Sequence, residues 1–274
     1  MICRVGDCEI YYETKGEGWP IFNLHGFTLD HRSMIGCMEP IFENRNGWKR
    51  FYLDLPGHGQ TNGGNSVRNS EDVLRLVLDF IDIMTPETRF VIAGLSYGGY
   101  LARAITHLRP KQVNGLLLIV PGMVPLPENR TLPERTVFVK DEHLLKSLSA
   151  EEREEFESVS VIQTEDQWRR YKEEITVGSQ LADRQYLERF DTTDDIFSFE
   201  QDMLSTSFGN PTLFLVGRQD QVVGYQDAWK VLENYPRASF AVLDRTGHAL
   251  PLEQSQLFNG LVNEWLDRVE SSMD

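Results

Sequence analysis

The fold is restricted most by one short stretch of sequence, RFVIAGLSYGGYLARAITHL. Residues 89–96 form an apolar run of strand length, and residues 97–108 repeat apolar side chains at helical spacing, with no loop between the two runs. A strand that enters a helix directly needs a strained turn at the junction, and Gly94 and Gly98 leave room there for neighbouring backbone. The stretch therefore predicts a strand–turn–helix unit that lifts the Ser96 side chain clear of a sheet edge.

Strand-like and helix-like runs alternate over both ends of the chain. Such alternation builds a doubly wound, mostly parallel α/β sheet with helices on both faces. With 274 residues, 41% of them hydrophobic, the chain can bury the core of such a sheet. Ser70 is the expected N-cap of the helix at 71–84. The expected strands are 2–5, 8–14, 20–26, one within 48–59 that stops at Pro56-Gly57, 89–96, 113–122, 211–220 and 239–244. The expected helices are 71–84, 97–108, 225–234 and 254–270.

The middle of the chain differs from both ends in its hydrophobic pattern and its charge. Between residues 122 and 205 long apolar runs are absent, and 20 Asp and Glu residues stand against 10 Lys and Arg. Two pairs fit the capping box that starts a helix: Ser149 with Glu152, and Thr164 with Gln167. The sequence therefore predicts a core domain from residues 1–121 and 206–274, interrupted by a helical cap, or lid, at 122–205.

Ser96 lies at the centre of a G-x-S-x-G pattern, which is typical of a serine nucleophile held at a strand-to-helix turn. A serine hydroxyl needs a base to take its proton and a further group to orient that base. His248 follows the last expected strand, and Asp220 follows the strand before it, so both should reach the sheet edge where Ser96 lies. We predict that Ser96, Asp220 and His248 form a catalytic triad. Asp244 is the rival carboxylate, but it lies at a strand end four residues before His248 and is expected to serve the loop.

Attack by Ser96 on a carbonyl would place negative charge on the substrate oxygen, which requires hydrogen-bond donors. The backbone N–H groups of Tyr97 and Phe27 are the predicted oxyanion-hole donors. His25 and His58 lie in His-Gly turns and are expected to be structural, and Asp54 is expected to bind loop amides.

Five motifs together resemble the α/β-hydrolase superfamily, in its small serine-nucleophile, esterase-like branch with a helical cap. They are HGF (25–27), DLPGHG (54–59), GLSYGG (94–99), GRQD (217–220) and GH followed by Glu253 (247–253). The resemblance covers the whole core and leaves the cap unmatched. It implies the same roles for the residues already chosen: Ser96 as nucleophile, His248 as base, Asp220 as acid, and Phe27 and Tyr97 as oxyanion donors.

The expected function is hydrolysis of a small-molecule carboxylic ester through an acyl-enzyme. A carbon–carbon bond hydrolase is the nearest alternative, although its relatives usually resemble one another in a tryptophan after the catalytic histidine, where Ala249 stands here. The motifs are also compatible with an aminopeptidase, a cofactor-free perhydrolase, or a binding module without turnover. Dehalogenases and epoxide hydrolases of similar shape carry aspartate in place of Ser96, which argues against both.

Charge and composition exclude several partner classes. The formal net charge of −15 disfavours nucleic acid and anionic membranes as main partners. The chain shows no spanning apolar run and no signal-peptide pattern, so a cytoplasmic protein with reduced Cys3, Cys8 and Cys37 is expected. No cluster of residues has metal-ligand spacing, so neither a metal nor an organic cofactor is expected.

Overall fold

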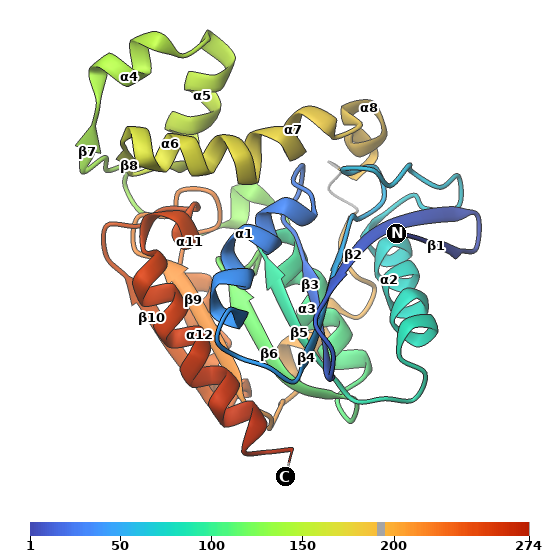
Figure 1. Ribbon diagram of the computed structural model, residues 1–274. Helices are drawn as coiled ribbons and strands as arrows, with labels where there is room; N and C mark the ends of the chain where they lie inside the picture. The colour runs from blue at the N-terminus through green and yellow to red at the C-terminus, as the bar shows by residue number, and fades with distance from the viewer. Residues whose placement is uncertain (191–194, 274) are drawn as a thin grey trace.

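The computed structural model describes residues 1–190 and 195–273. Its centre is an eight-stranded sheet in the order β1-β2-β4-β3-β5-β6-β9-β10 (Figure 1). The pairs β1–β2 and β2–β4 are antiparallel, and the remaining pairs are parallel. The strands are β1 (Ile2–Val5), β2 (Cys8–Lys15), β3 (Trp19–Leu24), β4 (Trp48–Leu53), β5 (Phe90–Leu95), β6 (Val113–Ile119), β9 (Thr212–Gly217) and β10 (Ala238–Leu243).

Helices cover both faces of the sheet (Figure 1). Neighbouring strand residues point to opposite faces, so Val91 packs with helices α1 (His31–Phe42) and α12 (Ser255–Glu270). Ile92 packs on the other face with α2 (Ser70–Met84) and α3 (Tyr97–Leu108). The predicted doubly wound, mostly parallel α/β fold is confirmed. Among the described residues, no helix is long and apolar enough to cross a membrane.

Several local differences separate the sequence predictions from the structure, and the strand expected within 48–59 ends at Leu53. Helix α1 was not predicted, because Gly36 and Pro40 interrupt its helical pattern. The expected helix at 225–234 is divided into α10 (Gln226–Lys230) and a short 3-10 turn. The N-cap of α2 is Asn69 and not Ser70, because the extended Asn69 places its side-chain oxygen 2.9 Å from the Asp72 amide.

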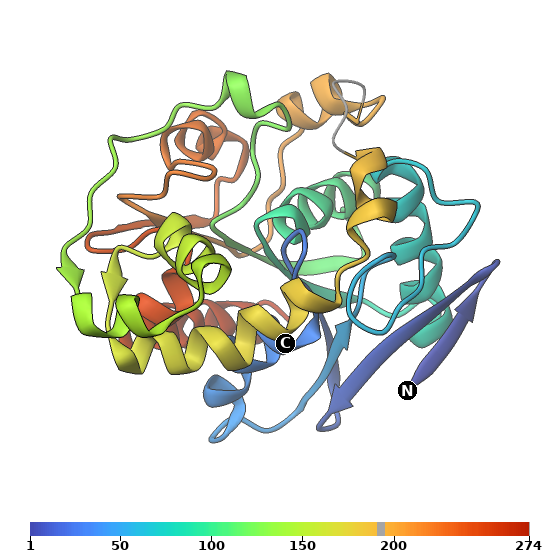
Figure 2. The ribbon, with the colours of Figure 1, turned by 90° about the horizontal axis from the view of Figure 1, so that it is seen from above.

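A helical segment joins β6 to β9, and we call its described residues, 122–190 and 195–205, the insert. Figures 1 and 2 show the insert over one end of the sheet. Ser149 and Glu152 form the predicted capping box at α5 (Ala150–Val159). Thr164 caps α6 (Glu165–Tyr171) without the reciprocal bond, and the Gln167 side chain donates to the Leu252 carbonyl. The main elements are β7 (Val139–Lys140), α4 (Glu142–Ser147), α5 (Ala150–Val159), β8 (Ile162–Gln163), α6 (Glu165–Tyr171), α7 (Val177–Leu181), α8 (Arg184–Leu187) and α9 (Glu200–Ser205).

Candidate active site

Ser96 occupies the turn between β5 and α3 in a strained backbone conformation, with φ of 52° and ψ of −111°. The two flanking glycines permit that turn. A Cβ added at Gly94 would lie 2.2 Å from the Gly98 carbonyl oxygen, and one at Gly98 would lie 2.2 Å from the Leu24 carbonyl oxygen. No side chain larger than hydrogen fits either position without moving the backbone, so the local sequence holds the serine at the sheet edge.

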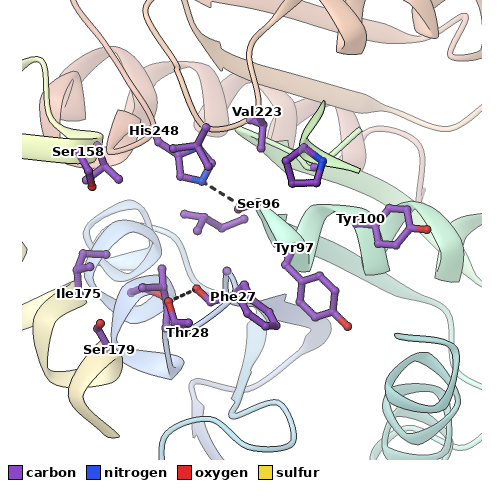
Figure 3. Close-up of a pocket in the computed structure, with 18 of the residues that line it drawn as sticks. Phe27, Thr28, Ser96, Tyr97, Tyr100, Ser158, Ile175, Ser179, Val223 and His248 are labelled. Atoms are coloured by element: carbon purple, nitrogen blue, oxygen red, sulfur yellow. Dashed lines mark hydrogen bonds between the residues drawn. The ribbon is translucent and has the colours of Figure 1, made fainter. Parts of the chain in front are cut away.

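The structure brings Ser96, His248 and Asp220 into one hydrogen-bonded chain. The Nε2 atom of His248 lies 3.0 Å from the Ser96 Oγ (Figure 3). Its Nδ1 lies 2.8 Å from an oxygen of Asp220. Because a carboxylate can only accept, Nδ1 carries the proton and Nε2 is left to accept from the serine hydroxyl. The three groups therefore have the geometry that proton transfer from the hydroxyl requires.

Asp220 is fully buried and its carboxylate is fixed by the loop that follows it. One oxygen accepts from the amides of Val222 and Val223, at 2.8 Å and 3.1 Å, while the other faces His248. The rival carboxylate, Asp244, instead accepts a hydrogen bond from the Gln219 side chain at 2.9 Å. Asp244 thus serves its loop, as the sequence suggested.

The predicted oxyanion donors lie beside the serine. Tyr97 is the first residue of α3, where a backbone N–H has no acceptor within the helix. Phe27 lies in the loop after β3, and both residues line the same cavity as Ser96 (Figure 3). A Cβ added at Gly26, the residue before Phe27, would lie only 3.4 Å from the Ser96 Cβ. The two backbone segments therefore flank the serine side chain.

Buried polar groups hold the loop that carries Phe27. The Nε2 of His25 accepts a hydrogen bond from the Leu55 amide at 2.9 Å, and its Nδ1 donates to the Gly26 carbonyl at 2.8 Å. Burial lowers the pKa of His25, which favours the neutral imidazole that this pattern needs. His25 is structural, as expected from its position in a His-Gly turn.

Asp54 ties together two loops behind the site. Its carboxylate accepts from the His31 amide and imidazole, both at 2.8 Å, and from the Gln60 amide at 2.9 Å. Burial opposes ionisation, but the hydrogen bonds from His31 and from the Gln60 amide outweigh it and lower the pKa of Asp54. Asp30, His31 and Asp54 approach closely enough to suggest a metal site, and in the structure Arg32 pairs with Asp30 and His31 with Asp54.

A cavity of about 980 Å³ opens between the sheet edge and the insert. Ser96 and His248 form its floor, and Ser158, Ile175 and Ser179 of the insert face them across it (Figure 3). Six carboxylates line the cavity: Glu128, Glu151, Glu154, Glu155, Glu188 and Asp195. Among the described residues, two guanidinium groups also line the cavity, so carboxylates outnumber cations and the walls carry net negative charge.

The acidic wall was not predicted residue by residue, although the sequence held a signal for it. Glu151, Glu154, Glu155 and Ser158 follow the spacing of one helical face, and all four line the cavity. The capping box fixes where the helix begins, but only the packing of α5 decides which face meets the cavity. The opposite side of α5 buries Phe156.

The mostly parallel eight-stranded sheet, with a serine at the turn between β5 and α3, identifies the protein as an α/β-hydrolase enzyme. The chain belongs to the serine aminopeptidase S33 family, whose model matches residues 23–255. The structure is similar to a crystal structure of an α/β superfamily hydrolase from Oenococcus oeni PSU-1, with a TM-score of 0.88, 29% identity, and coverage of 96% of this chain and 97% of that one.

Two curated relatives have different reactions in their names. Pimeloyl-[acyl-carrier protein] methyl ester esterase of Nitrosospira multiformis is 30% identical over 120 residues, which is 42% of this chain and 43% of that protein. The 2-hydroxy-6-oxononadienedioate/2-hydroxy-6-oxononatrienedioate hydrolase of Cupriavidus pinatubonensis is 26% identical over 265 residues, which is 91% of this chain and 82% of that protein. Both relatives are named as hydrolytic enzymes, and only the first name specifies an ester.

Proposed function

We propose that this enzyme hydrolyses small-molecule carboxylic esters through an acyl-enzyme formed on Ser96. The observation that carries the proposal is the unbroken chain of hydrogen bonds from Ser96 through His248 to Asp220. A non-catalytic binding module has no need for a strained serine, an imidazole and a buried carboxylate in this order. The geometry therefore supports turnover over binding alone.

In the first half of the reaction, His248 Nε2 takes the hydroxyl proton as Ser96 Oγ bonds to the ester carbonyl carbon. The carbonyl oxygen gains negative charge and accepts from the amides of Phe27 and Tyr97. The tetrahedral intermediate then expels the alcohol, which leaves with the proton that His248 returns. In the second half, water gives a proton to His248 as it attacks the acyl carbon. The second tetrahedral intermediate then breaks its bond to Ser96 Oγ and releases the acid, while His248 returns the proton to the serine oxygen.

Asp220 acts through His248 in this scheme. Its carboxylate keeps the imidazole in the tautomer with the proton on Nδ1 and stabilises the imidazolium that forms in each half-reaction. The amides of Val222 and Val223 hold the carboxylate and prevent it from turning away. The same groups that fix the orientation of Asp220 therefore fix the direction in which Nε2 points.

We further propose that residues 122–205 act as a cap that shapes the substrate pocket over this chemistry. Acidic walls favour neutral or cationic substrates over anionic ones. A dioate such as the one in the name of the Cupriavidus relative carries two carboxylates, which these walls would repel. Carbon–carbon bond cleavage of such a compound is therefore disfavoured, and the methyl ester in the name of the Nitrosospira relative points to ester chemistry.

An aminopeptidase is the second candidate, and a specific observation favours it. The acidic cavity could accept the free ammonium group of a peptide, and the family description names this activity. Turnover of amino-acid p-nitroanilides faster than p-nitrophenyl esters of matched size would favour this candidate. The reverse order is expected for an esterase, because an alcohol leaves more readily than an amine.

The direct test compares the wild type with Ser96→Ala on p-nitrophenyl acetate and p-nitrophenyl butyrate. Removing the hydroxyl eliminates the covalent route, so kcat should fall by roughly 10⁴-fold or more while circular dichroism shows an intact fold. Ser271→Ala, after the end of α12, is the matched control and should keep full activity. Comparable rates for Ser96→Ala and the wild type would overturn the proposal.

A further inference from the structure

Glu253 occupies an unusual position between the sheet region and the insert. It ends the short helix α11 (Leu250–Glu253), which begins two residues after His248. Its side chain is buried, and it accepts three backbone hydrogen bonds. One oxygen accepts from the amides of Val161 and Ile162 at 2.6 Å and 3.1 Å, and the other accepts from the Gly247 amide at 2.7 Å.

These three amides belong to segments far apart in the chain. Gly247 immediately precedes His248, whereas Val161 and Ile162 follow the end of α5, the helix that supplies the acidic wall. All three partners are donors, and the two oxygens of the Glu253 side chain accept from all of them. Burial raises the pKa of Glu253 above its usual value, although the three N–H groups act in the opposite direction. A buried carboxyl group is thus held in place by backbone donors from two segments of the chain.

The contact between the two segments is close enough to depend on glycine. A Cβ added at Gly247 would lie 2.6 Å from the Val159 carbonyl oxygen and 3.2 Å from a Val161 methyl group. The backbone before His248 therefore lies directly against the backbone at the end of α5. Displacement of either segment would be transmitted to the other, because no flexible side chain separates them.

Helix α11 is also fastened to the insert by packing. Leu252 belongs to the same hydrophobic cluster as Phe156, Trp168 and Tyr171, all from the insert. The Gln167 side chain donates to the Leu252 carbonyl at 3.1 Å. Figure 1 shows α6 lying next to α11. The segment that carries His248 is thus held on its N-terminal side by the bond from Gly247 to the Glu253 carboxylate, and on its C-terminal side by the packing of Leu252 in this cluster.

We infer that Glu253 is a positioning residue that sets the place of His248 and the place of the α5 wall together. The inference rests on the proposed function, since it assigns Glu253 to the same site. Its carboxylate fixes the Gly247 peptide, and through it the direction of the imidazole toward Ser96. The same carboxylate fixes the end of α5, so the pocket wall and the base are held by one buried group.

The test uses Glu253→Gln, which keeps the size of the side chain but replaces one acceptor oxygen with an NH₂ donor. In either amide orientation, at least one backbone N–H then faces a donor. A shift of the imidazole by about 1 Å can reduce turnover by about 10²-fold. We therefore expect kcat for p-nitrophenyl butyrate to fall by about 10- to 100-fold in Glu253→Gln, and further in Glu253→Ala.

Rates must be expressed per competent site, because both variants can lower the folded fraction. A fluorophosphonate titrates the reactive serine, and kcat is divided by the titrated concentration. A purely structural role would lower the titre and leave normalised kcat and the rate constant of labelling unchanged. A positioning role lowers both of these values. Glu264→Gln, which removes an exposed carboxylate paired with Arg268 on α12, is the matched control and should behave as the wild type.

The outcomes separate the two proposals. Wild-type normalised kcat and labelling rate in Glu253→Gln would overturn the positioning role while leaving the esterase function intact. A wild-type protein that neither labels nor cleaves esters would instead defeat the proposed function. Should Glu253→Ala not fold, Glu253→Asp provides the second variant, because its shorter side chain cannot reach both segments; its normalised kcat should fall as in Glu253→Gln, and a wild-type value would count against the inference.

Discussion

The sheet region and the insert use their residues in opposite ways. Strands β5, β6 and β9 are buried along their whole length, and the three groups proposed for catalysis follow β5, β9 and β10. In the insert, the ten-residue helix α5 buries only Phe156 and turns much of its surface toward the cavity or solvent. A large core thus positions the proposed chemistry, whereas a small cluster supports the pocket wall. Substitutions in the first region should change turnover and global stability, and substitutions in the second should change substrate choice.

The largest expected effect lies in the sheet region, at the proposed acid. Asp220→Asn should reduce kcat by about 10⁴-fold, because an amide NH₂ facing Nδ1 favours the wrong imidazole tautomer. Steady-state kinetics on p-nitrophenyl butyrate measure this loss. Asp244→Asn, at the rival carboxylate, should leave kcat near the wild-type value. If the two variants exchanged these effects, the assignment of the acid would be wrong.

A pair of matched phenylalanines compares the two cores directly. Phe51 lies in the sheet core and Phe156 in the insert cluster, and both are buried. Phe51→Ala should reduce the free energy of unfolding by about 3–5 kcal/mol, as expected for a large cavity. Phe156→Ala should reduce it less, because a small cluster near the surface can collapse around the gap, and should raise KM more. Urea denaturation and kinetics on the same samples would contradict the comparison if both variants lost equal stability with unchanged KM.

Acid should destabilise the sheet region through a buried histidine. Burial lowers the pKa of His58 to about 3, from 6.5 for an exposed histidine. The unfolded chain therefore binds this proton more tightly than the folded chain does. The resulting stability is fully present above pH 6.5 and is lost as the pH falls toward 3, with about 2 kcal/mol lost by pH 5.

The variant His58→Asn should remove this loss, so its free energy of unfolding should decrease less between pH 7 and pH 5 than that of the wild type. Denaturant titrations at several pH values measure the difference. His143→Asn, on the exposed surface of the insert, should keep the wild-type slope. Equal slopes for His58→Asn and the wild type would contradict the role of burial.

The smallest expected effect concerns the charge of the insert wall. An ester with a carboxylate on its acyl chain should have a KM about 3- to 10-fold higher than its neutral counterpart at low salt, which corresponds to about 1 kcal/mol of repulsion. Added salt should reduce the ratio through screening, and so should Glu151→Gln combined with Glu155→Gln. A lower KM for the anionic ester would show that the acidic wall does not select substrates.

The sequence predicted the sheet region better than the insert for a physical reason. Buried strands appear as apolar runs, and the ends of parallel strands meet at one edge, so the approach of Asp220 and His248 to Ser96 could be anticipated. Helix α1 was not predicted, because Gly36 and Pro40 interrupt the helical pattern of its sequence. Its packing against the sheet stabilises the helix in spite of these two residues. Local signals located the start of α5 but not the direction it faces.

Glu253 shows where sequence reasoning ends. Its place after the Gly-His pair was part of the family resemblance, but its partners are backbone amides. Almost every residue has a backbone N–H, so the identities of Val161 and Ile162 do not indicate that their amides bind a carboxylate. Contacts of this kind emerge only from the three-dimensional arrangement.

The most direct measurement is to map a fluorophosphonate adduct by mass spectrometry after treatment of the wild-type enzyme. The proposed mechanism predicts one adduct per chain, on the peptide that contains Ser96, formed together with complete loss of esterase activity. His248→Ala should label far more slowly. An adduct on another residue that accompanies the loss of activity, or full activity with Ser96 modified, would contradict the mechanism.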